Sequence, residues 1–343
     1  MRSLPSGLAA MPRDRARTAP PFSAALLADC GGSIGLGHLR RSLVLAEALS
    51  AAGLRARVAT PGAAGVRAIE AAGIEPMAWP SRPQDLAPHD VLVIDHYGIA
   101  AETMTRWRRR ARLRLVIDDL ADHALDADLV LNQNLFAHQI SYDGVASCPV
   151  LRGPGYALVD PAFHAIAERR TRGARALVSF GGSDDGSLAL RAAGWLRDAG
   201  FAGPIDLVVS PLREVARDLA AAVPEGIKLH HGASMPALMA GAFVYVGGAG
   251  STIFEAAAAG LAMLPVAIAA NQQRNVAALR ALGLAALPQP EPAAAVTGLR
   301  SLLADPARHR LPDLVPEGGP ARVVRHVLAR LALCDRSELS LRY

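Results

Sequence analysis

Lysine is almost absent from this chain of 343 residues: Lys228 stands alone, and arginine supplies the rest of the 36 basic side chains. Aromatic residues make up only 4% of the sequence, and the three cysteines, Cys30, Cys148 and Cys334, lie far apart. An odd number of scattered cysteines argues against a disulfide framework and against a Cys-x-x-Cys metal site. This use of cysteine is typical of a reducing compartment, so we expect a cytoplasmic protein.

Long apolar runs are also lacking. A helix that crosses a bilayer needs roughly 18 or more consecutive apolar residues, and here Arg, Asp, Gly or Pro interrupts every run before that length. Residues 1–22 are rich in Pro, Arg and Ser and lack the apolar core of a signal peptide. We therefore expect a soluble protein without a membrane span. The first 22 residues are interpreted either as a disordered extension or as the result of a wrongly assigned start codon, in which case Met11 is the other candidate for the first residue.

The basic side chains form one dense run within a chain whose formal net charge is +5. Nucleic-acid binding would pair such a run with exposed aromatic residues or a known module, and only Trp107 is near. The run is more typical of the solvated face of a surface helix, and we expect no nucleic-acid partner. Its members are Arg106, Arg108, Arg109, Arg110, Arg112 and Arg114.

Strand-like apolar runs alternate with helical patterns along most of the chain, which predicts parallel sheets in α/β layers. In the first half the predicted strands are Ala24–Ala28, Ala56–Thr60, Val91–Asp95, Leu113–Asp118, Leu129–Asn132 and Val150–Gly153, with helices over 37–52, 63–73 and 101–111. In the second half they are Ala176–Phe180, Ile205–Ser210, Ile227–His230, Val244–Val246 and Met263–Ile268, with helices over 186–199, 212–222, 251–260 and 272–282.

The length, about twice that of a usual domain, favours two domains. A charged segment near residue 172 breaks the apolar rhythm, so we place the linker there, between a first domain over 23–170 and a second over 171–343. The predicted fold is α/β, with two Rossmann-like domains whose parallel sheets face an interdomain cleft. Ligands of such sheets bind at the carboxyl ends of the strands, and we expect the active site in that cleft.

Two glycine-rich turns each join a strand end to a helix start. The first contains Gly35 and Gly37 and is followed at once by His38, and the second contains Gly250, Ser251 and Thr252, with Glu255 one helical turn later. Glycines let the backbone approach a ligand, and a helix start offers unpaired N–H groups to phosphate. Either turn alone could serve only to pack a helix on a strand, but the pair predicts a nucleotide site.

The chemistry of the candidate residues follows from their types. His38 can take a proton near neutral pH, although it could also be a cap or a packing residue. Glu255 could accept ribose hydroxyls or be an ordinary solvated helix residue, and Tyr97 could be a half-buried aromatic. Neither turn matches Gly-x-Gly-x-x-Gly or Gly-x-x-x-x-Gly-Lys-Ser/Thr, which disfavours NAD binding and P-loop ATP hydrolysis.

An ordered series of motifs over roughly residues 24–290 resembles the UDP-2,4-diacetamido-2,4,6-trideoxy-β-L-altropyranose hydrolases of pseudaminic acid synthesis. The motifs are Ile34-Gly35-Leu36-Gly37-His38 with Arg41, Ile94-Asp95-His96-Tyr97, Ile117-Asp118-Asp119-Leu120, Asn132-Gln133-Asn134, Gly153-Pro154-Gly155-Tyr156-Ala157-Leu158, Phe180-Gly181-Gly182-Ser183-Asp184, Gly250-Ser251-Thr252-Ile253-Phe254-Glu255 and Asn271-Gln272. The chain departs from the usual family pattern at Leu27, Asn132, Asp160 and Ser187, which puts the exact sugar in doubt.

The resemblance implies a fold of the GT-B glycosyltransferase type, with the nucleotide held mostly by the second domain. It implies an enzyme that transfers the sugar of a UDP-sugar to water with inversion, without a metal or cofactor, and we expect a monomer. The catalytic residues would be His38 as base, with Tyr97 and Asn271 beside the sugar. The ligand-binding residues would be Gly35, Gly37, Arg41, Gly181, Gly182, Ser183, Gly250, Ser251, Thr252, Glu255 and Gln272.

Two rival functions remain open. A glycosyltransferase of the same architecture would use an acceptor hydroxyl in place of water. A protein that only binds a nucleotide sugar would not need His38. Asp118 and Asp119 form an acidic pair that invites a metal interpretation, but neighbours on a strand point to opposite sides, so we expect no metal there.

Overall fold

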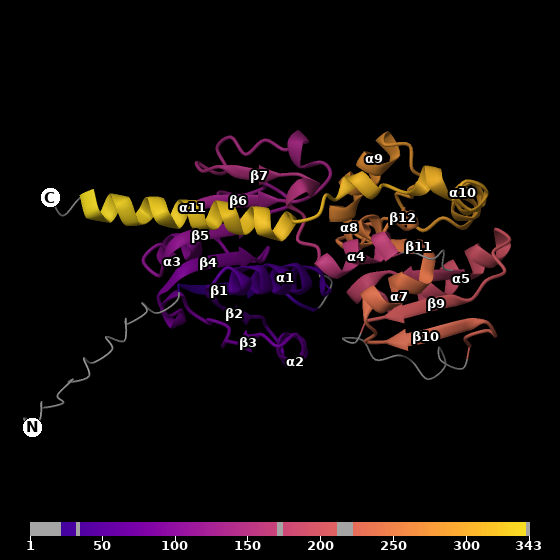
Figure 1. Cartoon of the computed structure of the whole chain (residues 1–343), viewed down its shortest axis with the longest axis horizontal. Helices are drawn as coiled ribbons and strands as arrows, with labels where there is room; N and C mark the ends of the chain where they lie inside the picture. Colours follow the sequence, from indigo (N-terminus) through magenta and orange to yellow (C-terminus); the bar gives the residue numbers. More distant parts are fainter. Residues whose placement is uncertain (1–21, 32–34, 170–173, 211–221, 341–343) are drawn as a thin grey trace, which may run out of the picture.

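The computed structural model describes residues 22–31, 35–169, 174–210 and 222–340, and it contains two parallel β-sheets with helices packed around them (Figure 1). The predicted extension over 1–22 lies almost wholly outside the described residues, as do the predicted helix 212–222 and the linker position near residue 172. Among the described helices, none is long and apolar enough to cross a membrane.

The first sheet has seven strands in the order β3-β2-β1-β4-β5-β6-β7, and its pairs are parallel. The strands are β1 (Ser23–Ala28), β2 (Arg55–Ala59), β3 (Glu75–Pro76), β4 (His89–Asp95), β5 (Ala111–Ile117), β6 (Leu129–Asn132) and β7 (Val150–Arg152). Its helices are α1 (Gly37–Ala51), α2 (Ala63–Ala71) and α3 (Ala101–Trp107), with short 3-10 turns η1 (Pro83–Asp85), η2 (Ala137–Gln139) and η3 (Pro154–Tyr156). The next helix, α4 (Pro161–Arg169), packs against helices of the second half.

The second sheet has five parallel strands in the order β10-β9-β8-β11-β12. The strands are β8 (Arg175–Ser179), β9 (Ile205–Val209), β10 (Ile227–His231), β11 (Ala242–Gly248) and β12 (Ala262–Val266). The helices that follow β8 in the chain are α5 (Ser187–Asp198), α7 (Met235–Gly241), α8 (Thr252–Ala258), α9 (Gln273–Ala281), α10 (Pro292–Ala304) and α11 (Gly319–Ser340), with 3-10 turns η4 (Gly181–Ser183), η5 (Ala270–Gln272), η6 (Pro306–His309) and η7 (Pro312–Leu314).

The predicted α/β fold with two parallel sheets is confirmed, and each predicted strand appears within two residues at either end. The central strands are apolar on both faces because helices and loops cover both faces of a parallel sheet. Strand β1, for example, buries every residue after Ser23, and α1 covers it with Leu39, Leu45 and Leu49. Such strands read as continuous apolar runs, which is why the sequence located them well.

We predicted that the basic run at 106–114 lies on the face of one surface helix, and this prediction is wrong. Helix α3 ends at Trp107, four residues before the predicted end at 111, and β5 begins at Ala111. Arg114 is buried in β5, where its guanidinium pairs with Asp126 at 2.8 Å and Asp128 at 3.0 Å. The run is therefore divided between a helix end, a turn and a strand.

The last helix, α11, returns to the first half of the molecule (Figure 1). It packs against α1, β5 and η3, and Val323, Val327 and Leu331 join the apolar core of the first sheet. The predicted second domain over 171–343 includes this helix, whereas its packing places it with the first sheet. We propose that the first domain comprises the residues before α4 together with α11, and that α4, which packs against α7 and α8, belongs to the second domain.

Candidate active site

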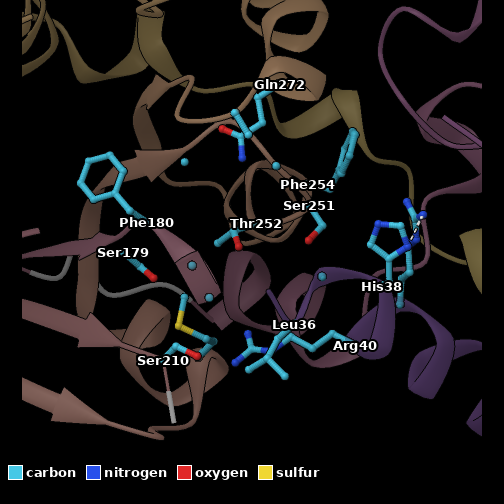
Figure 2. Close-up of a pocket in the computed structure, with 18 of the residues that line it drawn as sticks. Leu36, His38, Arg40, Ser179, Phe180, Ser210, Ser251, Thr252, Phe254 and Gln272 are labelled. Carbon is cyan, nitrogen blue, oxygen red and sulfur yellow. Dashed lines mark hydrogen bonds between the residues drawn. The ribbon is translucent and has the colours of Figure 1, made fainter. Parts of the chain in front are cut away.

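A cavity of about 450 Å³ lies where the carboxyl ends of strands from both sheets meet (Figure 2). Residues after β4 and β5 and the start of α1 line it from the first half, and residues after β8, β9, β11 and β12 line it from the second. Eleven of the predicted site residues contribute to its wall: Gly37, His38, Arg41, Tyr97, Gly181, Gly182, Gly250, Ser251, Thr252, Asn271 and Gln272.

A buried charge cluster forms the wall supplied by the first half. The Asp95 side chain, at the end of β4, is fully buried, and its Oδ1 lies 2.6 Å from His38 Nδ1 on α1. Arg41, one helical turn after His38, donates from Nε to Asp95 Oδ2 at 2.7 Å and from Nη2 to Oδ1 at 2.6 Å. A bidentate guanidinium of this kind fixes the carboxylate plane, and the carboxylate in turn orients the imidazole.

Asp119 extends this cluster from the residue pair after β5. Its carboxylate accepts hydrogen bonds from the Arg41 guanidinium at 3.2–3.3 Å, from the Tyr97 hydroxyl at 2.8 Å and from Asn134 Nδ2 at 2.7 Å. The Tyr97 ring meets the His38 ring edge-on, with 4.6 Å between centroids. One arginine thus holds two carboxylates, which in turn hold a histidine and a tyrosine at the cavity.

The charges of this wall shift the pKa values of its acids in a consistent direction. Burial alone would raise the pKa of Asp95, but Arg41 and His38 outweigh it and hold the pKa well below its usual value. The pKa of Asp119 is also lowered, against the effect of burial, chiefly by Arg41. Burial and the Asp119 charge raise the pKa of Tyr97 far above its usual range. The carboxylates are therefore ionised near neutral pH and the tyrosine keeps its proton.

The first predicted glycine turn contacts two turns of the second half, the one at Gly182 and the second predicted glycine turn at Ser251. A Cβ atom placed on Gly182 would lie 2.4 Å from Gly35 Cα, and one on Gly37 would lie 3.1 Å from Ser251 Oγ. Gly35 has φ +75°, a conformation that favours glycine. Gly35 supports this contact but does not line the cavity itself. The halves of the molecule therefore touch through backbone atoms at the site.

The wall supplied by the second half carries no charged side chain. Ser251 and Thr252 stand at the start of α8, opposite His38 and Arg40 (Figure 2). Gln272 Oε1 accepts hydrogen bonds from the backbone N–H groups of Ala249 at 3.2 Å and Ile268 at 3.0 Å, which joins the β11 and β12 turns. The Gln272 amide N–H₂ group is not used by these contacts. This wall presents hydroxyls, an amide and backbone in place of fixed charges.

Asn271 does not cap a helix. Asn271 and Gln272 lie in the 3-10 turn η5, and α9 begins one residue later without a side-chain cap. Asn271 is exposed at the cavity, close enough to the Tyr97 hydroxyl to influence its pKa. For Ser183, the structure describes the backbone, in η4, but not the side chain.

Arg41, which we predicted among the ligand-binding residues, lines the cavity, and its guanidinium is engaged by Asp95 and Asp119. The neighbouring Arg40 points from α1 into the same cavity (Figure 2). Among the described residues, no carboxylate lies within ion-pair distance of Arg40. The sequence did not distinguish these two adjacent arginines. Their side chains leave α1 in different directions, and only the packing of the helix decides which one meets the carboxylates and which one faces the cavity.

Glu255 lies one turn into α8, behind the cavity wall and not among the residues that line it. Burial raises the pKa of Glu255. The charge of Arg40 lowers this pKa in part, and the charge of Asp160 raises it further. Within the described part of the chain, the buried Oε2 atom of Glu255 has no hydrogen-bond partner. A buried acceptor of this kind costs free energy until a donor satisfies it.

The acidic pair after β5 divides as predicted. Asp118 turns away from Asp119 and accepts hydrogen bonds from the Tyr142 hydroxyl at 2.8 Å and from the backbone N–H groups of Leu120 and Ala121. Among the residues that the structure describes, no group of three or more His, Cys, Asp or Glu side chains is placed to hold a metal ion.

Sequence reasoning missed four residues of the site and gave Asp95 too little weight. Asp119, Asn134, Asn275 and Arg40 all line the cavity. The available signal was position: Asp95, Asp119 and Asn134 each stand at or just after the carboxyl end of neighbouring strands β4, β5 and β6. Polar residues at that edge of a parallel sheet are candidates for a site whatever their type.

The sequence of this chain is similar over about half its length to one curated protein. No protein-family model matches the chain. Among curated proteins it is 27% identical, over 184 residues, to the UDP-2,4-diacetamido-2,4,6-trideoxy-β-L-altropyranose hydrolase of Campylobacter jejuni. That match covers 48% of this chain and 62% of the relative, so it spans less than two thirds of the relative's length.

Solved structures match over nearly the whole chain. One is the spinosyn rhamnosyltransferase SpnG complexed with thymidine diphosphate, with a TM-score of 0.60 and 18% identity over 89% of this chain and 99% of that one. Another is Phytolacca americana UGT2 complexed with UDP-2-fluoro-glucose and pterostilbene, with a TM-score of 0.62 and 12% identity over 91% of this chain and 100% of that one. The chain has the GT-B fold. The predicted pair of Rossmann-like domains facing a cleft is thereby confirmed.

Proposed function

We propose that this protein is a hydrolase that removes UDP from a UDP-linked 2,4-diacetamido-2,4,6-trideoxy hexose. The observation that carries the proposal is the buried Asp95–His38 pair on one side of a cavity whose other side offers hydroxyls and glycine backbone. A fixed base facing an uncharged nucleotide wall suits attack by water on a nucleotide sugar. The printed activity of the Campylobacter jejuni relative and the order of the sequence motifs support the same reaction.

In this proposal His38 activates the water. The Asp95 carboxylate only accepts hydrogen bonds, so at 2.6 Å it holds the proton of the neutral imidazole on Nδ1 and leaves the lone pair on Nε2. Nε2 takes a proton from water as the water oxygen bonds to the anomeric carbon. The bond from that carbon to the β-phosphate oxygen breaks, and its electron pair leaves with UDP. A single displacement from the opposite face inverts the anomeric centre.

The leaving group needs charge stabilisation more than a proton. Ordinary glycosidases protonate an alcohol leaving group, whereas UDP departs as a stable anion. We assign this stabilisation to Arg40, to the start of α1 and to the Ser251 and Thr252 hydroxyls, which share one cavity. This assignment replaces the predicted role of Arg41, and Gly37, Gly181, Gly182 and Gly250 let the backbone approach the diphosphate.

The remaining candidate residues take supporting roles in the proposal. Glu255 is given no ligand contact in this proposal, because it lies behind the cavity wall. Tyr97, which stays protonated, and the exposed Asn271 lie together at the cavity and would orient the sugar. The proposal requires no cofactor.

Isotope labelling tests the reaction. The purified protein is incubated with UDP-2,4-diacetamido-2,4,6-trideoxy-L-altrose in oxygen-18 water, and early time points are analysed by mass spectrometry beside free sugar that reports spontaneous exchange. We expect unlabelled UDP and sugar labelled at the anomeric oxygen above the exchange control. Label in UDP would show attack at phosphorus and contradict the mechanism.

The His38→Ala variant separates a hydrolase from a protein that only binds its ligand. We expect this variant to keep its affinity for UDP and to lose turnover by at least about 10³-fold, since general-base catalysis and water orientation are both removed. Full hydrolysis by the variant would contradict the assignment of the base.

A glycosyltransferase is the second candidate, favoured by the fold shared with SpnG and UGT2. In that case the same base would deprotonate an acceptor hydroxyl. UDP release would then depend on an added acceptor, and water alone would give none.

A further inference from the structure

We infer that Asn275, on α9, reads the sugar of the ligand by accepting a hydrogen bond from a sugar hydroxyl or amide N–H at its Oδ1 atom. This inference rests on the proposed function and adds a specificity-determining residue to it. Asn275 lines the cavity, and its side chain belongs to neither glycine turn nor to the catalytic pair.

The direction of hydrogen bonding around Asn275 follows from a carboxylate. Ionised Asp119 can only accept, so the group of Asn134 that lies 2.7 Å from it must be the amide N–H₂. Both hydrogens of that N–H₂ group are then used, one by Asp119 and one by Asn132 Oδ1 at 3.1 Å. The Asn134 oxygen is left as an acceptor, and it faces Asn275 at 3.3 Å.

Asn275 therefore has its orientation fixed as well. Its N–H₂ group donates to Asn134 Oδ1 at 3.3 Å and to the backbone oxygen of Ala249 at 3.2 Å, which uses both hydrogens. Turning the amide over would face oxygen with oxygen at both contacts. The series of hydrogen bonds from Asn275 through Asn134 to Asp119 thus leaves the Asn275 oxygen as the atom that is free to bind a ligand.

That oxygen has no partner among the described residues. Asn275 is only 3% exposed, so bulk water does not satisfy the atom either. A buried acceptor left without a donor costs about 1–3 kcal/mol. The side chain nonetheless lines a cavity large enough for a ligand, so a donor on a group that fills the cavity would remove this cost.

The position of Asn275 indicates which part of the ligand supplies the donor. Its amide joins Asn134 of the first half, beside Asp119 and Tyr97, to Ala249 of the second half, at the turn that precedes Ser251. It therefore lies between the proposed base and the proposed diphosphate turn, which is where the sugar must sit. Hydroxyl and amide N–H groups of the sugar are donors, whereas a diphosphate offers only acceptors near neutral pH.

Equilibrium binding tests the inference. Dissociation constants for UDP, UDP-glucose, UDP-N-acetylglucosamine and the UDP-diacetamido sugar are measured by titration calorimetry in the His38→Ala background, which prevents turnover. We expect Asn275→Ala to weaken binding of a sugar nucleotide about tenfold, as for the loss of one hydrogen bond, and to change UDP binding less than twofold. A loss confined to acetamido sugars assigns the donor to the amide, and a loss shared with UDP-glucose assigns it to a hydroxyl.

The controls separate this role from a structural one. Gln273→Ala alters the same helix at an exposed position outside the cavity and should change neither affinity. Asn275→Ser, which retains one donor for the protein contacts, should lose the sugar preference as Asn275→Ala does, and UDP binding shows that each variant is folded.

Three outcomes would overturn the inference. Equal weakening of UDP and of the sugar nucleotide would make Asn275 a support of the nucleotide turn, and unchanged binding of both would remove any role. Failure of the unsubstituted chain to bind UDP or its sugar conjugates would overturn the proposed function as well.

Discussion

The two walls of the cavity are built in opposite ways. The wall from the first half holds ionised groups in fixed positions: Asp95, Asp119 and Arg41 are buried and bonded to one another. The wall from the second half offers glycine backbone and the small hydroxyls of Ser251 and Thr252. Apart from Arg40, the charged groups of the first wall are paired with one another before any ligand arrives, whereas the second wall leaves its polar groups for a ligand.

The difference between the two walls suits them to different roles in the proposed reaction, with the base on the first wall and the diphosphate against the second. Buried charges that are already paired do not need to reorganise when a proton moves, which is the property that a catalytic base requires of its surroundings. Small neutral groups and backbone can approach a diphosphate closely without competing charges. Breaking the two walls separately should therefore change different measurable quantities.

The largest effect is expected from the first wall, with Asp95→Asn. An amide cannot accept from both His38 and Arg41 as the carboxylate does, so the imidazole loses its fixed tautomer and Arg41 loses a buried counter-charge. We expect kcat for UDP release to fall about 10³-fold, while the dissociation constant of UDP changes little. Steady-state kinetics and calorimetry measure the two quantities.

The matched control is Asp90→Asn, which removes a carboxylate from the other end of the same strand, β4, where it bonds Ser23 and Arg112. Its kcat should stay within about twofold of the unsubstituted chain. A fall in UDP affinity as large as the fall in kcat for Asp95→Asn would mean that the walls do not act separately.

A smaller effect is expected from Arg40→Ala, which removes the cation that faces the second wall. We expect UDP to bind about tenfold more weakly and its affinity to depend less on salt, since a charge-assisted contact to phosphate is lost. Titrations at two salt concentrations measure both changes. Arg280→Ala, an exposed arginine of α9, is the control, and an unchanged salt dependence in Arg40→Ala would exclude Arg40 as the phosphate ligand.

The smallest effect is expected from Glu255→Gln. The contribution of Glu255 to stability changes with pH in the direction opposite to that of Asp95. Burial raises the pKa of Glu255 above its usual value of 4.5, so the unfolded chain releases this proton at a lower pH than the folded one does. Its contribution to stability is therefore greatest at low pH and is lost as the pH rises through the raised value. The pKa of Asp95 is lowered, so its contribution is present above the usual value of 3.8 and is lost on acidification.

We therefore expect Glu255→Gln to raise Tm by about 2 °C at pH 7.5 and to give no gain at pH 4. Thermal unfolding followed by circular dichroism at both pH values measures the difference. Glu70→Gln replaces an exposed glutamate and should leave Tm unchanged at either pH. The same gain for Glu255→Gln at both pH values would contradict the account.

Much of the fold could be predicted from sequence because parallel strands, covered on both faces, are continuous apolar runs. The second glycine turn was equally visible, as it joins such a run to a helix. The contacts that cross the chain were not visible: nothing in the pattern of α11 says that Val323 and Val327 pack on the first sheet and not the second. Helix patterns define an apolar face but not its partner.

The site shows the same limit. His38 and Ser251 could be found because glycines mark their turns, whereas Asp95 has no local mark and gains its importance from Arg41, 54 residues earlier in the chain. Arg40 and Arg41 have the same side chain, and only the packing of α1 decides that Arg41 meets carboxylates. Glu255 was expected at the cavity, but it lies behind the wall.

The return of α11 to the first half also has a consequence during synthesis. The first sheet leaves the ribosome long before the residues that cover its α1 and β5 side, since Val323 is made some 200 residues after the end of β5. The nascent first half must wait, with part of its core uncovered, until translation is nearly finished. Ribosomes that stop early would release a chain whose second half can close its own core, while its first half remains exposed to chaperones and proteases.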